Sequence, residues 1–133
     1  MQLSDIDEVI QLWDSIKELR FSREFDNKAR VTQFLMRNEN LSSIARENDK
    51  LIGALLCGHD GRRGFIYHTG VDEAFRHQGV ASGMLKRSLA ALKRESIDTC
   101  FLFTNDFNKE AREFWVYQGF EYAPHVMYHS RSI

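Results

Sequence analysis

The chain has little proline and little cysteine, with one Pro124 and two cysteines, Cys57 and Cys100, among its 133 residues. No repeat, low-complexity segment or linker interrupts it. The cysteines lie far apart, each inside an apolar run, and form no C-x-x-C pair. We therefore expect two buried, reduced thiols rather than a disulfide framework. The five histidines are equally scattered, so no zinc or other metal site is expected.

The sequence also lacks a long apolar run and an excess of one charge. No run approaches the ~20 apolar residues that a membrane-spanning helix needs, and the N-terminus lacks the pattern of a signal peptide. The formal net charge is −1, so neither nucleic acid nor an anionic membrane is an expected partner. With 43% hydrophobic and 28% charged residues, we expect a single soluble, cytoplasmic domain over residues 1–133.

Two helical patterns come first. Ser4 or Asp5 is the expected N-cap of the first, and a charged loop over residues 18–26 follows it. The second helix ends at residues 38–40. Apolar residues at helical spacing define the two helices, namely Ile6, Val9, Ile10, Trp13 and Ile16, then Val31, Phe34 and Leu35.

A β-meander is predicted next. Residues 42–47 and 51–57 have strand patterns, and Asn48-Asp49 between them favours a tight hairpin turn. Residues 60–64 form a second turn before a third strand over residues 65–71.

The second half alternates helix and strand. A strand over residues 98–104 should lie parallel to its predecessor if the preceding helix is a right-handed crossover. A helix over residues 109–118 ends at Gly119, where a left-handed residue is usual, and residues 120–122 and 126–129 are expected to be closing strands. These elements indicate an α/β fold with a mixed sheet, a β-meander followed by a βαβ unit. The crossover helix has one apolar face, formed by Val80, Met84, Leu85, Leu89 and Leu92.

The stretch Arg76-His77-Gln78-Gly79-Val80-Ala81 lies between the third strand and this helix. A strand that breaks into a small-residue loop and opens a helix presents backbone N–H groups at the positive end of the helix dipole. Together with the arginine, these groups make an anion site suited to a pyrophosphate. The hexapeptide fits R-x-x-G-x-A and resembles the acyl-coenzyme A loop of the GNAT superfamily of N-acetyltransferases.

The resemblance covers nearly the whole chain. Residues 66–71 lead into residues 72–76 like the family's strand before that loop, and the run at 59–64 is similar to a small stand-alone bacterial subgroup. The resemblance implies a GNAT acyl-CoA N-acyltransferase fold, acetyl-CoA as co-substrate, and acetyl transfer to a primary amine of a small molecule or peptide by direct attack in a ternary complex. A later segment resembles N-x-x-A-x-x-x-[YW]-x-x-x-G-F through Asn105, Asn108, Ala111, Phe114, Trp115, Gly119 and Phe120.

The same resemblance implies the residues of the donor site. Thr69, Gly70 and Val71 would pair with the pantetheine arm through their backbone, and the Val71 N–H would donate to the thioester oxygen. Asn105 or Asn108 could bind the arm, or cap the helix that begins at Lys109. The pyrophosphate would be held by the loop and the helix start, over Arg76, His77, Gln78, Gly79, Val80, Ala81, Ser82 and Gly83.

The sequence does not determine which residues act as general acid and general base. Many family members have a tyrosine where this chain has Trp115, whose indole N–H is no usable acid near neutral pH. Tyr128, Tyr67 and water are other candidate acids, whereas Tyr117 should point elsewhere. The candidate bases are Glu24, Asp26, His59, Asp60 and His68. Each has a structural alternative, such as a helix N-cap for Asp26 and a turn for Asp60.

Family members usually begin with a short strand, for which residues 1–4 leave almost no room. We therefore expect that edge strand to be short or absent, and the exposed edge could favour a homodimer. An alternative function is a weakly catalytic acyl-CoA sensor or partner-binding module, which Trp115 favours. A P-loop or dinucleotide site is not supported, because G-x-x-x-x-G-K-[ST] and G-x-G are missing. Ser82 is in no G-x-S-x-G elbow.

Overall fold

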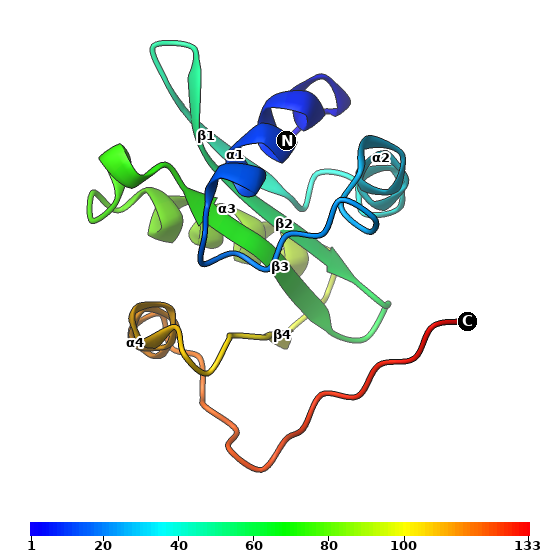
Figure 1. The fold of residues 1–133 in the computed structure, drawn as a ribbon. Coiled ribbons are helices and arrows are strands. Elements are labelled where there is room, and N and C mark those ends of the chain that lie inside the picture. The colour runs from blue at the N-terminus through cyan, green and yellow to red at the C-terminus, as the bar shows by residue number, and fades with distance from the viewer. The chain divides into compact units, whose positions relative to one another are not determined.

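The computed structural model describes residues 1–133, which form two compact units over residues 1–103 and 104–133. Each unit is described by itself. No helix is long and apolar enough to cross a bilayer. The first unit contains η1 (Leu3–Asp5), α1 (Ile6–Ser15), α2 (Lys28–Arg37), β1 (Ser43–Glu47), β2 (Lys50–His59), β3 (Gly64–Val71), η2 (Glu73–Phe75), α3 (Val80–Arg94) and β4 (Cys100–Leu102), and the second contains α4 (Lys109–Tyr117) (Figure 1).

The sheet has the strand order β1-β2-β3-β4. β1, β2 and β3 form an antiparallel meander, and β4 runs parallel to β3, as the sequence predicts. Asn48 and Asp49 join β1 to β2 with φ of 47° and 66°, which are the left-handed values that a tight hairpin turn requires. No strand precedes η1, so β1 is the edge of the sheet.

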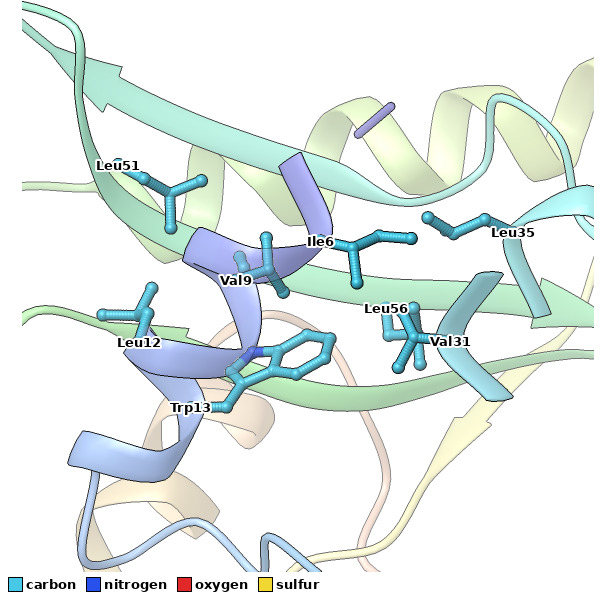
Figure 2. Close-up of a cluster of buried hydrophobic side chains, with 9 residues drawn as sticks. Ile6, Val9, Leu12, Trp13, Val31, Leu35, Leu51 and Leu56 are labelled. Atoms are coloured by element: carbon cyan, nitrogen blue, oxygen red, sulfur yellow. The ribbon is translucent and has the colours of Figure 1, made fainter. Parts of the chain in front are cut away.

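Helices cover both faces of this sheet, with α1 and α2 on one face and α3 on the other (Figure 1). Because side chains alternate along a strand, glycines mark where each helix comes close. A Cβ at Gly53 would meet Met84 of α3, whereas one at Gly58 would meet Phe34 of α2. Figure 2 shows the core between α1, α2 and the sheet, which comprises Ile6, Val9, Leu12, Trp13, Val31, Leu35, Leu51, Ala54 and Leu56.

Asp5, one of the two residues predicted as N-cap, is the N-cap of α1, but its side chain does not cap the helix. The chain enters α1 through the 3₁₀ turn η1, so the N–H groups of Asp5 and Ile6 bond to the carbonyls of Gln2 and Leu3. No side chain caps α1. The Asp5 carboxylate instead accepts from the Gln2 N–H at 2.6 Å, and Ser4 is exposed.

In the second unit, α4 begins and ends as expected. The Asn108 side chain accepts from the Ala111 N–H at 3.0 Å, and Gly119 has a φ of 89° just after the helix. The closing strands predicted at 120–122 and 126–129 were wrong, because neither segment pairs with a strand. Pro124 lies between them without an N–H, and Val126 folds back to donate to the Ala123 carbonyl at 3.2 Å.

Candidate active site

The far half of β3 has an open side. β4 pairs with β3 only over Gly64, Phe65 and Ile66, so residues 67–71 have no strand neighbour on that side. On the other side, Gly70 pairs with Ala54 in β2, and the Asp72 N–H donates to the Ile52 carbonyl at 2.8 Å. These bonds flank Val71, and its own N–H therefore points away from β2, toward the open side.

A β-bulge lies within this open segment. The β2–β3 register shifts by one residue between Ala54 and Leu56, which places an extra residue in β3 near His68. His68 has a φ of 42°, a left-handed value that few residues other than glycine adopt. Its neighbour Thr69 has a buried hydroxyl oxygen without a hydrogen-bond partner in the structure. The bulge could not be predicted from the sequence, because one histidine within a strand pattern does not mark a left-handed position.

The loop after β3 leads into a helix start that no side chain caps. Gly79 is the N-cap of α3, with a φ of 79° that a residue with a Cβ rarely adopts. Gly83 donates the first intrahelical bond, to the Gly79 carbonyl at 2.9 Å, so the N–H groups of residues 80–82 precede the helical ladder. A Cβ at Gly79 or Gly83 would meet no atom within 4 Å. This end of α3 has the form of an anion site.

Arg76 lies at the start of the loop but turns back to β3. Its Nε donates to the Val71 carbonyl at 3.3 Å, and its Nη2 pairs with Glu18 at 3.3 Å. The side chain thus ties the last residue of β3 to the segment that follows α1. Its contribution to an anion site stays a prediction, as do those of His77 and Gln78.

Three of the five candidate bases are unsuited to act as a base, because they have other partners or are exposed. His59 uses both ring nitrogens, one with Glu95 at 2.8 Å and one as acceptor from the Gly61 N–H at 3.0 Å. Asp60 accepts from the backbone N–H groups of Arg63 and Arg62, which lower the pKa of its carboxyl to about 2. So low a pKa makes a poor base near neutral pH. Glu24 is exposed.

The other two candidates meet. The His68 Nε2 lies 2.7 Å from the Asp26 Oδ1, although 42 residues separate them. The alternative that Asp26 caps the second helix was wrong, because Asn27 caps α2 by accepting from the Arg30 N–H at 3.2 Å. This pair could not be predicted from the sequence, because the two residues meet only when α1 and the loop after it fold over β3.

The remaining predicted site residues belong to the second unit. Asn108 serves as the cap of α4, one of the two roles expected for it, and the Asn105 carbonyl accepts from its N–H at 3.0 Å. Trp115 is buried, and its ring centroid lies 4.9 Å from that of Phe114 and 5.3 Å from that of Phe120. Tyr128 is exposed.

In this meander the third strand is bulged and loses its parallel neighbour, and it leads into a helix start that no side chain caps. These features define an acyltransferase-like α/β fold. The family model described as "Acetyltransferase (GNAT) family" matches residues 6–120. The chain therefore belongs to the GNAT family of acetyltransferases.

Individual relatives agree with this assignment. "Acetyltransferase YE1169" of Yersinia enterocolitica is 33% identical over 86 residues, which are 65% of this chain and 60% of that relative's length. An aminoglycoside 6′-N-acetyltransferase of Acinetobacter haemolyticus is similar over all of this chain and 96% of its own, with a TM-score of 0.80 and 20% identity. A PaiA N-acetyltransferase of Thermoplasma acidophilum, solved with coenzyme A, covers 91% of this chain and 86% of its own, with a TM-score of 0.78 and 18% identity. At such identities the two structures establish the fold alone.

Proposed function

We propose that this chain transfers an acetyl group from acetyl-CoA to a primary amine of a small molecule or peptide, by direct attack in a ternary complex. One observation carries the proposal: the open edge of β3 leads within a few residues to the uncapped start of α3. A strand edge accepts an extended arm with amide groups, and a helix start accepts phosphates. Membership of the GNAT family and the coenzyme A bound to the Thermoplasma acidophilum relative support this reading.

The chain's backbone fits such a donor. When bound, acetyl-CoA would supply an acetyl group activated as a thioester. The open segment Thr69 to Val71 would pair with its arm, beside a Thr69 hydroxyl that lacks a partner, and the amides that begin α3 would face its pyrophosphate. The outward Val71 N–H would polarise the thioester oxygen, a role that Arg76 supports by holding the carbonyl of the same residue at 3.3 Å.

The donor assignment is tested by calorimetric titration with acetyl-CoA, with ATP and NAD as ligand controls. We expect selective binding that Gly79→Glu abolishes, because the new carboxylate would repel the pyrophosphate at the helix start. Gly61→Glu is the matched control: Gly61 also has a positive φ, 89°, and open space around it, but lies in the β2–β3 turn. Unchanged affinity in a folded Gly79→Glu variant would contradict the loop assignment.

Turnover is tested with a panel of amines: a peptide with a free α-amino group, a lysine peptide, spermidine, phenethylamine and methoxyamine. Acetylation of at least one amine is expected. Binding of acetyl-CoA without acetylation of any amine would instead favour a sensor or partner-binding module on the same fold.

Within this proposal, Tyr128 is the group that protonates the departing thiolate, because Trp115 has no usable proton to give. Tyr128→Phe should then lower turnover ~10²-fold or more. Tyr122→Phe is the control, since Tyr122 is a similarly exposed tyrosine with no proposed role. A near-normal rate in Tyr128→Phe would exclude Tyr128 as the acid.

A further inference from the structure

His68 and Asp26 form an enclosed polar pair beside the open edge of β3. Asp26 comes from the loop between α1 and α2, and His68 from the bulge in β3. Their side chains are only 17% and 16% exposed, so bulk water has limited access to the bond between them. His68 stands three residues before Val71, which has the proposed oxyanion donor.

The surroundings fix the orientation of both side chains. The second carboxylate oxygen of Asp26 accepts from the Ser22 N–H at 2.7 Å. The His68 ring packs against the indole of Trp13, with 5.1 Å between ring centroids, and Trp13 is fully buried. Asp26 thus has one oxygen left for His68, and the imidazole has little freedom to rotate.

This arrangement determines which ring nitrogen can react. With Nε2 bound to the carboxylate, the neutral imidazole has its hydrogen on Nε2 and presents Nδ1 as an acceptor. No hydrogen bond occupies Nδ1 in the structure. A carboxylate on the opposite nitrogen also stabilises the imidazolium that would form after Nδ1 takes a proton.

Other charged groups around the pair are neutralised or exposed. On and after α1, Asp14 pairs with Arg23 at 2.6 Å and Glu18 pairs with Arg76 at 3.3 Å. The other charged residues of the same stretch, Lys17, Arg20 and Glu24, are exposed. Asp26 is therefore the charged group that acts directly on the His68 ring.

The backbone at His68 is a second, independent observation. A non-glycine residue in the left-handed region inside a strand is conformationally costly, and such residues concentrate at functional sites. Here the left-handed residue has the side chain that pairs with Asp26, at the point where β3 loses its neighbour. A residue needed only for strand pairing would not require this conformation.

We propose that His68, held by Asp26, is the base that takes a proton from the attacking ammonium, directly or through one water. This inference rests on the proposed function. Nδ1 accepts one proton from the ammonium, and the neutral nitrogen bonds to the acetyl carbon as the carbon–sulfur bond breaks. Tyr128 gives its proton to the departing sulfur and takes back the second proton of that nitrogen, and His68 returns its own proton to water. Asp26 acts as a positioning residue.

The test compares an amine that is protonated at neutral pH, phenethylamine, with one that is neutral there, methoxyamine. His68→Gly removes the ring at a position whose φ suits glycine. We expect kcat with phenethylamine to fall ~10²-fold or more, and kcat with methoxyamine to change less than about threefold, because it needs no base. Added imidazole should restore part of the phenethylamine rate.

Two further variants separate a base from a structural residue. Asp26→Asn should lower the phenethylamine rate less than His68→Gly does and should not respond to imidazole. Asn40→Gly is the matched control, because Asn40 also has a positive φ, 63°, outside the site, and its rates should stay normal. In His68→Gly, the phenethylamine rate should keep rising as the pH approaches ~10, where the amine becomes neutral.

The outcomes are distinguishable. Equal losses with both amines in His68→Gly, without rescue by imidazole, would overturn the base role and leave the pair a structural contact. Acetyl-CoA binding without acetylation of any amine by the unaltered protein would also overturn it. A lack of acetyl-CoA binding by the unaltered protein would contradict the proposed function itself.

Discussion

β3 comes close to α1 at Gly70. A Cβ built there would lie 2.6 Å from the Cδ1 of Ile16 and 3.2 Å from the Cδ1 of Trp13. The end of the Ile16 side chain can give way, whereas the indole is fully buried and resists displacement. Gly70 is thus required for the close approach of helix and strand, and its backbone lies in the proposed donor site.

Gly70→Ala should lower the free energy of unfolding by about 1–3 kcal/mol, the usual cost of an overpacked contact. Gly53→Ala is the matched variant, in a strand of the same sheet. There the new methyl would lie 2.9 Å from the terminal Cε of Met84 and 3.0 Å from the Cγ1 of Val80. The methionine end adapts more easily than a buried indole does. Both changes restrict the unfolded chain equally, so urea unfolding of the two isolates the contact. Equal losses would contradict this account.

At the scale of elements, Arg46 connects α1 to the β1–β2 hairpin. Its guanidinium pairs with Asp5 at 3.0 Å and with Glu8 at 2.9 Å, and donates to the Asp49 carbonyl at 2.7 Å. Asp5 is nearly buried. Burial alone would raise the pKa of its carboxyl, but the Gln2 N–H and Arg46 outweigh that effect and hold the pKa below its usual value.

A lowered pKa in the folded state stabilises the fold above the unfolded pKa of ~3.9 and loses that effect as the pH falls. The protein should therefore lose stability between pH 6 and pH 3. Asp5→Asn should be less stable at pH 6 by about 1–3 kcal/mol, with a shallower dependence on pH. Urea unfolding at several pH values measures both effects. Asp7→Asn is the control, because Asp7 forms an exposed pair with Lys28 and should matter little. An unchanged pH slope in Asp5→Asn would contradict this role.

Elements with a strong local pattern were predictable. The apolar spacing of Val9 and Trp13, and the turn residues Asn48-Asp49, express preferences that the fold does not override. The closing strands were not predictable, because a short apolar pattern around Pro124 becomes a strand only where another strand accepts its bonds.

In the candidate site, too, some features could be predicted from the local sequence and others could not. Gly79 at the helix start follows from local sequence, since its left-handed φ of 79° is a conformation that glycine adopts freely. The pairing of His68 with Asp26 does not, because the contact depends on a bulge and on a loop 42 residues away. Likewise, only the folded structure shows that Arg76 turns back to the Val71 carbonyl.

At the scale of the whole molecule, the two cysteines report on different depths of the first unit. Cys57 lies in β2 between two strands and is fully buried, whereas Cys100 is half-buried on β4. The expectation of two unpaired thiols is confirmed, and full burial holds for Cys57 alone. Burial raises the pKa of Cys57 to about 12 and that of Cys100 to about 11, so both are protonated and unreactive near neutral pH.

Thiol labelling in urea should therefore proceed in two phases. Cys100 needs only the opening of β4, a strand of three residues, and its labelling should depend weakly on urea. Cys57 is reached only when the meander itself opens, so its labelling should follow the global unfolding of residues 1–103, with the same urea dependence as loss of the far-UV signal. Cys100→Ser and Cys57→Ser each isolate one phase. Labelling of Cys57 with the weak urea dependence of Cys100 would show that the sheet opens locally at its centre, and that the strand which supports the proposed donor edge is not part of the stable core.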